Sequence, residues 1–238
     1  MGKMVRSILD SYRVCVNRKI KNNNRIVTMK RTVFISILIF VLALSVQGQT
    51  KLSPAQQKHV IEQIDKSVKS VSSIQCDFSQ TKTMKMLKKT MTSQGVMYFK
   101  RDNKLRWQYT SPYDYIFIIN GTQVSLKSQH SSQKIDTNKN KVFNQIAKVI
   151  LNSITGRGLN NGTDFSCVMY QNGATYSAKL YPKKKELKQV YTVIELFFNS
   201  KFMVTNVRME EKTGDVTNIK LSNVKTNISI NEKYFSIN

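Results

Sequence analysis

Apolar and polar residues alternate along most of the chain. From Ile74 onward this period of two predicts β-strands, at residues 74–85, 91–100, 104–110, 114–120, 122–129, 163–170, 174–182, 189–199, 202–211 and 215–225. Most of these strands are separated by pairs of turn-forming residues, namely Asp102-Asn103, Asn120-Gly121, Asn172-Gly173, Asn199-Ser200 and Thr213-Gly214. Such pairs accept positive φ angles or make local side-chain hydrogen bonds, as tight hairpins require. We therefore predict an antiparallel meander of about ten strands.

Two segments have apolar residues at helical spacing instead. The first follows Ser53-Pro54, an N-cap residue and a proline that suits the first helical position, and its apolar stripe is Val60, Ile61, Ile64, Val68 and Val71. The second covers residues 141–155, with Val142, Phe143, Ile146, Val149, Ile150 and Ile154 three or four residues apart. Two helices beside a long meander give an α+β fold.

Several predicted strands are apolar on both faces. One face would carry Val96, Tyr98, Leu105, Trp107, Tyr109, Ile194, Leu196 and Phe198, yet Met97 and Phe99 flank Tyr98, and residues 115–119 are continuously apolar. Two helices cannot cover both faces of such a sheet. The strands either curl into a packed barrel, or curl partly around an apolar cavity that a helical lid closes. A barrel of about eight strands fills with its own side chains, so roughly ten strands leave room for a ligand.

In the hollow arrangement, the eight residues on the first face form the cavity wall. The lid is then formed by Val142, Ile146, Val149 and Ile150. Residues 81–91 contain no acid and place apolar side chains around an expected turn, at Met84, Met86, Leu87 and Met91. Apolar groups flanked by lysines suit a lipid headgroup surface or the entrance for an amphiphile. A hairpin folded down onto its own domain explains the same pattern.

The N-terminal residues have the pattern of a secretory signal. Lys30 and Arg31 precede an apolar run over residues 32–46, which is short of the roughly 20 residues of a spanning helix. We predict a signal peptide at residues 29–48, with cleavage before Gln49; an uncleaved anchor is the alternative. Residues 1–28 would make the leader unusually long, so we expect Met29 to be the true start. Residues 49–238 then form a single domain.

Positive charge dominates the composition. The 238 residues have a formal charge of +24, and residues 49–238 keep 29 basic residues against 13 acidic ones, or +16. Such a surplus favours an anionic membrane or nucleic acid as partner. Residues 97–115 interleave basic and aromatic side chains, which suits either a single-stranded nucleic-acid platform or the wall of a curved sheet. Because export favours the membrane, we expect the wall and no nucleic-acid partner.

Catalytic and metal-binding patterns are missing from the sequence. His59 and His130 are far apart, and no nucleophile elbow, P-loop or metal motif is present. We expect no enzymatic activity, cofactor or metal. Cys76 and Cys167 lie at strand spacing among apolar residues, which leaves a disulfide and two separate core thiols both open.

The motifs of residues 52–125 resemble the LolA-like family of periplasmic outer-membrane lipoprotein carriers. The resemblance lies in Val71-Ser-Ser73, Phe78-Ser-Gln80, Gly95, Phe99-Lys-Arg101, Leu105-Arg-Trp107, Tyr109, Pro112 and Asn120-Gly121. It implies an incomplete antiparallel β-barrel with a helical lid, whose apolar cavity shields the acyl chains of lipoproteins between the inner and outer membranes. It further implies an inner-membrane ABC-type releasing complex and an outer-membrane acceptor as partners. We expect a periplasmic monomer.

Arg101 matches a functional arginine of the resembled family. In that family the arginine bonds to the lid and helps it open and close, and proline usually follows it, whereas this chain has Asp102. An acid at that position would compete for the hydrogen bonds of Arg101, and an ordinary solvated turn arginine is the alternative reading. For the whole chain, the alternative is a non-enzymatic envelope-binding module that docks on anionic lipid or lipopolysaccharide.

Overall fold

The structure of the chain is a computed structural model that describes residues 48–139, 149, 151–153, 155, 158–159 and 162–237. The chain divides after Gly48, and the unit Gln49–Asn238 contains all the elements described below. Every buried core side chain of the described residues lies between Leu52 and Phe235, so this unit contains its own core. The leader and nearly all of the expected signal peptide, residues 1–47, lie outside the described residues.

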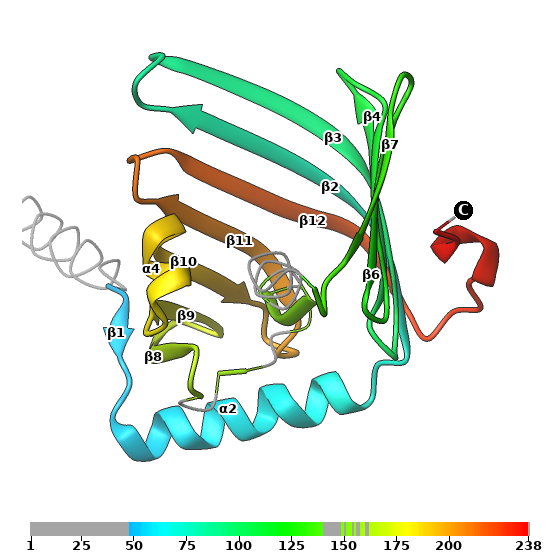
Figure 1. Ribbon diagram of the computed structural model, residues 1–238. Helices are drawn as coiled ribbons and strands as arrows, with labels where there is room; N and C mark the ends of the chain where they lie inside the picture. Colours follow the sequence, from blue (N-terminus) through cyan, green and yellow to red (C-terminus); the bar gives the residue numbers. More distant parts are fainter. Residues whose placement is uncertain are drawn as a thin grey trace, which may run out of the picture. The chain divides into compact units, whose positions relative to one another are not determined.

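In the described part of the chain, twelve antiparallel strands form one sheet (Figure 1). In chain order they are β1 (Thr50–Lys51), β2 (Ser73–Met84), β3 (Lys89–Lys100), β4 (Lys104–Ser111), β5 (Tyr115–Asn120), β6 (Gln123–Ser128), β7 (Ser132–Asp136), β8 (Phe165–Asn172), β9 (Thr175–Pro182), β10 (Tyr191–Phe198), β11 (Val204–Glu211) and β12 (Val216–Thr226). The order across the sheet is β1-β8-β9-β10-β11-β12-β2-β3-β4-β5-β6-β7. Two meanders, β2 to β7 and β8 to β12, therefore meet where β12 pairs with β2.

The sheet is unclosed, as the family resemblance implied, because β1 and β7 stand at opposite ends of the strand order. The strand number is twelve instead of about ten. The two additional strands are β1, which has two residues, and β7, which has five. Both lie at a sheet edge and pair on one side only, and neither has the apolar alternation on which the prediction relied.

Most of the predicted turn residues adopt the backbone angles that tight turns demand. Asp102 and Asn103 have φ values of 69° and 58°, and Gly121 and Gly214 have values of 61° and 85°. The turn after Asn199 works differently. There the Asn199 side chain accepts hydrogen bonds from the backbone N–H groups of residues 201 and 203, at 2.9 and 3.0 Å.

The first helix, α2 (Pro54–Lys69), begins as its sequence predicts. The Ser53 hydroxyl accepts a hydrogen bond from the Gln56 backbone N–H at 3.4 Å, and the Gln56 side chain accepts one from the Ser53 N–H at 3.0 Å. This reciprocal capping box satisfies two backbone donors that the helix itself cannot. The predicted stripe is buried, with Val60, Ile61, Ile64 and Val68 all at most 7% exposed.

Under α2 the inner face of the sheet is packed solid. Ile64 is fully buried, and Ile74, Phe99, Leu105 and Ile119 join it in one core cluster. The space left between the end of α2 and the strands beneath it measures only about 10 Å³. That is room for about one water molecule.

A short helix replaces the beginning of one predicted strand. α4 (Lys185–Val190) precedes β10, which starts at Tyr191 instead of residue 189. The sequence Lys-Glu-Leu-Lys-Gln-Val has neither helical nor strand periodicity long enough to identify it, and only Leu187 is buried.

The C-terminal residues cover the outer face of the sheet (Figure 1). They end in a 3-10 turn, η1 (Glu232–Phe235), and the fully buried Phe235 accepts a hydrogen bond through its carbonyl from Asn120 at 3.1 Å. Ile118, which alternation places on the outer face, is 1% exposed. The C-terminal segment thus supplies the cover for a stretch that is apolar on both faces, a cover the two predicted helices could not provide.

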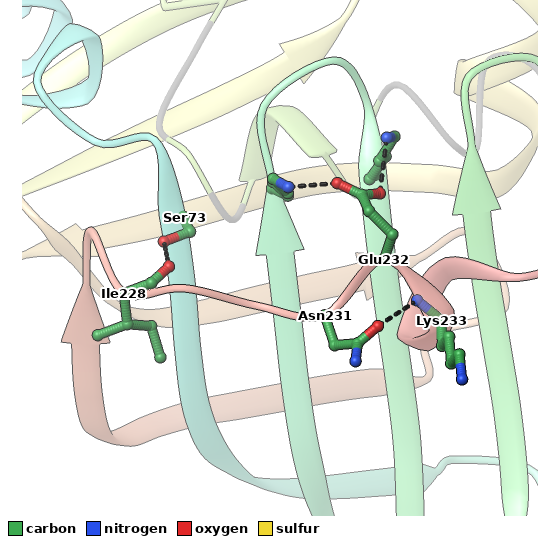
Figure 2. A network of polar contacts seen from close by, with 7 residues as sticks. Ser73, Ile228, Asn231, Glu232 and Lys233 are labelled. Carbon is green, nitrogen blue, oxygen red and sulfur yellow. Dashed lines mark hydrogen bonds and ion pairs between the residues drawn. The ribbon is translucent and has the colours of Figure 1, made fainter.

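Polar contacts fix this segment at both of its ends (Figure 2). Ser73 donates a hydrogen bond to the Ile228 carbonyl at 2.6 Å. Glu232 bridges Lys100 and Lys104, with its oxygen 2.8 Å from the Lys104 Nζ. Hydrogen bonds from these two lysines lower the pKa of Glu232 from its ordinary 4.5 to about 2.

The two cysteines of the described chain are free thiols in the core. Cys76 is 1% exposed and Cys167 is 7% exposed. Burial raises the pKa of each thiol to about 12. Of the two possibilities left open by the sequence, the structure has separate core thiols, which are unreactive at neutral pH.

Candidate functional site

A cavity of about 240 Å³ lies against the inner face of the sheet. Its lining comes from five strands, from the start of β10 and from the segment before β8, and consists of Gln80, Trp107, Tyr109, Tyr115, Phe117, Val149, Ser153, Tyr191, Val207, Met209, Ile219 and Leu221. Pockets for drug-sized ligands span roughly 300–1,000 Å³. The volume of the cavity lies below this range, so the cavity has room for only a small part of a long amphiphile.

Strand pairing places the aromatic wall on one face. Trp107 of β4 lies opposite Phe117 of β5, and Tyr109 lies opposite Tyr115. Side chains directly opposite one another in an antiparallel pair share a face. Alternation along β4 and β5 therefore directs all four rings to the cavity side.

A glycine allows these rings to pack closely. Phe78 lies 4.2 Å from Trp107 between ring centroids and makes an edge contact with Tyr109 at 5.2 Å. A Cβ atom on Gly95 would lie 2.6 Å from the Phe78 ring and 1.9 Å from the Gln108 carbonyl oxygen. The bare backbone at position 95 thus accommodates Phe78 behind the cavity wall.

Among the described residues, the cavity wall carries no charged side chain. Its titratable groups are tyrosines, and burial raises the pKa of Tyr109, Tyr115 and Tyr191, so their phenols are neutral at physiological pH. The Tyr109 hydroxyl donates a hydrogen bond to the Gln80 side chain at 3.1 Å. The Trp107 indole N–H is buried without a hydrogen-bond partner in the described part of the chain. A neutral wall suits a hydrocarbon chain and disfavours an ion.

One side of the cavity is bounded by the segment predicted as the lid. Its described residues Val149, Leu151, Asn152, Ser153 and Thr155 are helical, and Val149 and Ser153 line the cavity. The other predicted lid residues, Val142, Ile146 and Ile150, lie outside the described residues.

The eight predicted wall residues do not stay together. Trp107 and Tyr109 line the cavity. Four others are buried in the core cluster and are not part of the lining, namely Leu105, Ile194, Leu196 and Phe198. These four residues belong to the packed core of the same fold. The prediction placed them on the cavity wall because alternation identifies the face of a strand but not what fills the space above that face.

The predicted face was wrong for Val96 and Tyr98. Met97, between them, is fully buried and lies opposite Trp107, so Val96 and Tyr98 point to the outer face. There the Tyr98 ring packs on Tyr234 of the C-terminal segment, with centroids 4.5 Å apart. The sequence pattern does not distinguish a tyrosine that is covered by a distant segment, as Tyr98 is, from one that lines a cavity.

Nine of the twelve lining residues were not predicted as wall or lid. They are Gln80, Tyr115, Phe117, Ser153, Tyr191, Val207, Met209, Ile219 and Leu221. The pairs on β11 and β12 are spaced by two, which is the signal that could have identified them. Gln80 and Ser153 carry no such signal, because small polar residues rarely indicate an apolar wall.

Arg101 bonds to the end of α2. Its Nε donates to the Val71 carbonyl at 2.8 Å and its Nη2 to the Lys69 carbonyl, while its backbone N–H donates to the Ser72 carbonyl at 2.9 Å. The sequence placed these bonds on the lid at residues 141–155. The described contacts instead join the β3–β4 turn to the last residue of α2 and to the residues just after it, where a guanidinium also complements the helix dipole.

The predicted entrance residues surround the β2–β3 turn. Met86 and Leu87 are 86% and 69% exposed. Met84 and Met91 are half-buried, and their register opposite Lys89 and Lys82 continues the cavity face along the hairpin. The hairpin does not fold down onto its domain at its tip.

Known proteins resemble the chain over most of its length. The family described as "Outer membrane lipoprotein carrier protein LolA" matches residues 69–238. This chain belongs to the LolA family. Among its relatives, an outer-membrane lipoprotein carrier protein of Francisella tularensis is 25% identical over 207 residues, covering 87% of this chain and 92% of that protein. One of Legionella pneumophila is 24% identical over 202 residues, covering 85% and 92%.

Two solved structures are also similar to the chain. A LolA superfamily protein of Nitrosomonas europaea has 14% identity and a TM-score of 0.42, covering 75% of this chain and 96% of that one. The Mycobacterium tuberculosis lipoprotein LppX has 12% identity and a TM-score of 0.44, covering 75% and 99%. Within the described part of this LolA-family chain, no helix has the length and apolarity to cross a membrane, and no group of His, Cys, Asp and Glu residues is placed to hold a metal ion.

Proposed function

We propose that this protein is a periplasmic carrier that shields the acyl chains of lipoproteins in its apolar cavity and delivers them from the inner to the outer membrane. The observation that supports this most directly is the uncharged aromatic and aliphatic cavity in an unclosed sheet. Membership of the family, whose members include the outer-membrane lipoprotein carriers named above, supplies the class of cargo. The function is binding and transport, with no chemical step.

The physical need for such a container follows from the hydrophobic effect. Burying one methylene contributes about 0.8 kcal/mol, so a chain of about fifteen methylenes gains on the order of 12 kcal/mol on leaving water. A lipoprotein therefore does not cross an aqueous space with its acyl chains exposed. Because the cavity of about 240 Å³ is smaller than such cargo needs, loading requires the segment with Val149 and Ser153 to move away from the strands.

We place the control of this opening at Arg101 and the lid. In the empty state, the Arg101 guanidinium fixes the end of α2 through the carbonyls of Lys69 and Val71. Release of these bonds frees the end of α2, which borders the same small space as Thr155 of the lid segment, so that the lid can move away from the strands. Val142, Ile146, Val149 and Ile150 complete the lid in this proposal, and an inner-membrane ABC-type releasing complex and an outer-membrane acceptor are the partners.

The second candidate is an envelope-binding module without acyl cargo. The surplus of 29 basic over 13 acidic residues in 49–238 favours it, because anionic lipid or lipopolysaccharide would bind such a surface. The two candidates differ in one measurable property, which is whether the cavity takes up an acyl chain.

Filling the cavity tests the carrier function. Ser153 lies on the cavity wall and is 6% exposed, so Ser153→Phe places a ring in the space that an acyl chain would occupy. Ser222→Phe is the matched control, because Ser222 is exposed on β12. Trp107 is the only tryptophan of the chain and lines the cavity, so its fluorescence reports binding directly.

The assay uses a triacylated lipoprotein and residues 49–238, which contain the whole described core. Native mass spectrometry should find a soluble complex with the unchanged protein and with Ser222→Phe, and about a tenfold loss with Ser153→Phe, which corresponds to about 1.4 kcal/mol. Circular dichroism checks folding, and Ile219→Phe provides a second filling variant. Equal complex formation by both filling variants, or none by the unchanged protein, would overturn the carrier proposal.

A further inference from the structure

Several turns lie together at one end of the sheet. Because neighbouring strands are antiparallel, the β2–β3 turn, the β11–β12 turn and α4 all lie at the same end. Hydrogen bonds join them: the Lys85 backbone N–H donates to the Asp215 carboxylate at 3.0 Å, and the Lys212 N–H donates to the Val190 carbonyl at 2.9 Å. We call residues 82–89, 183–190 and 211–215 the basic rim.

The basic rim has a large positive surplus. Its nine lysines stand against three carboxylates, those of Glu186, Glu211 and Asp215, and the lysines are Lys82, Lys85, Lys88, Lys89, Lys183, Lys184, Lys185, Lys188 and Lys212. Lys82 pairs with Glu211 at 2.8 Å, and Lys184 pairs with Asp164 at 2.5 Å. Among the described residues the other seven lysines make no ion pair. Their charge is available to an external anion.

Apolar side chains project from the same end. Met86 and Leu87 form the tip of the β2–β3 hairpin, and they are the two most exposed large apolar residues of the described chain. The hairpin extends past its neighbour, because pairing with β4 begins only at Gln94 (Figure 1). Two further exposed aromatic residues, Tyr113 and Tyr181, also lie at this end of their strands.

The cavity lies towards this end as well. Its lining residues Gln80, Tyr109 and Met209 are each within a few positions of the ends of β2, β4 and β11, where the chain enters the turns. The basic rim therefore borders the end of the sheet at which the cavity is found, while α2 fills the opposite end.

We propose that the basic rim docks on a bilayer containing anionic phospholipid, with Met86 and Leu87 entering the headgroup layer. Each lysine near such a surface contributes about 1 kcal/mol, and apolar side chains add the free energy of leaving water. A nucleic acid would use the lysines but gives no favourable site to an aliphatic tip. The docking surface extends the proposed carrier function, yet its test needs no lipoprotein, so the two proposals fail independently.

Vesicle binding tests the docking. Residues 49–238 are mixed with phosphatidylcholine vesicles with and without phosphatidylglycerol, and the bound fraction is measured by co-sedimentation at low and high salt. We expect binding that is about tenfold tighter with phosphatidylglycerol and that weakens with salt. Binding of equal strength to both kinds of vesicle would overturn the proposal.

Two variants separate the charged and the apolar contributions. Met86→Ser with Leu87→Ser should weaken binding about tenfold without removing the preference for phosphatidylglycerol, whereas Lys85→Gln, Lys88→Gln and Lys89→Gln together should remove most of that preference. Val224→Ser with Lys225→Gln is the matched control, because this exposed apolar and basic pair lies at the other end of β12. Equal losses in the control and the rim variants would contradict docking by the rim.

A label at the hairpin tip tests insertion directly. Met86→Cys carries an environment-sensitive fluorophore, and the native thiols of Cys76 and Cys167 are spared because both are buried and unreactive. We expect a blue shift on anionic vesicles and none for a label at Val224→Cys. An unshifted tip label, or a shift only with lipopolysaccharide micelles and not with vesicles, would refute insertion into a phospholipid bilayer.

Discussion

The inner face of one sheet is packed solid at one end and hollow at the other. At the solid end, Ile74, Phe99 and Leu105 lie under the apolar stripe of α2, and the pocket between the end of α2 and the strands measures about 10 Å³. At the hollow end, the same strands contribute Trp107 and Tyr109 to a cavity of about 240 Å³. β4 itself runs from the solid end to the hollow end, with Leu105 and Trp107 on the same face.

The difference between the two ends lies in what covers the strands. A helix of sixteen residues lies on the solid end and presents four buried aliphatic side chains. The hollow end is bounded by the segment that includes Val149 and Ser153, where a small serine occupies a wall position. A cavity in this fold is thus created by the absence of filling side chains, and not by a different kind of strand. The two ends should therefore respond differently to the same substitutions.

The largest expected effect contrasts one substitution at the two ends. Ile64→Ala removes a fully buried side chain from the solid end and should lower the free energy of unfolding by about 4 kcal/mol. Ile219→Ala changes a half-buried residue beside existing space and should cost about 1 kcal/mol. Urea unfolding of both variants measures the contrast. Equal losses would mean that the hollow end is as tightly packed as the solid one.

A smaller loss of stability, with a change in the cavity, is expected for Gly95→Ala. The new methyl group would meet the Gln108 carbonyl and the Phe78 ring, so the unfolding free energy should fall by about 3 kcal/mol. Displacement of Phe78 would move Trp107, with which it stacks, towards the hollow end. Trp107 fluorescence should therefore shift, whereas Ile64→Ala should leave it unchanged. An unshifted spectrum with an intact fold would contradict the role of Gly95 in shaping the wall.

Arg101→Leu tests the attachment of α2 at the solid end. Loss of the bonds to the carbonyls of Lys69 and Val71 should lower the unfolding free energy by about 1 to 2 kcal/mol. The variant should still fold. Because it lacks the bonds that fix the end of α2 in the empty state, it should retain its cargo when acceptor membranes are added. Arg101→Lys keeps the positive charge but lacks the planar guanidinium that donates to two carbonyls at once. It should therefore transfer lipoprotein as poorly as Arg101→Leu. Normal lipoprotein transfer by Arg101→Leu would refute its assigned role.

The smallest effect concerns the outer face, away from both ends. Lys100 and Lys104 lower the pKa of Glu232 to about 2. The ionised carboxylate therefore stabilises the folded state fully above pH 4.5, and this stabilisation is lost as the pH falls towards 2. Glu232→Gln should lower the melting temperature slightly at pH 7, and the difference should vanish near pH 2. A difference that persists at pH 2 would mean that the carboxylate charge is not its source.

Local patterns in the sequence predicted the elements well and the cavity poorly. The capping box at Ser53, the apolar stripe of α2 and the positive φ angles at Asp102 and Asn103 all depend on neighbours within a few residues, and all are found. The family was recognised from motifs in the same N-terminal part. Tyr98 was placed on the wrong face because the segment that covers it, around Tyr234, is more than a hundred residues distant in the chain.

By itself, the sequence determined the strand alternation, the turns and the first helix, since backbone propensity and side-chain period act over a few residues. Only the tertiary structure decided which inward-facing residues meet a helix and which border empty space. Leu105 and Trp107 are two residues apart on one strand and share a face, yet one is packed solid and the other lines the cavity. The space beside each depends on how distant segments fill the volume above the sheet, and no local pattern records that volume.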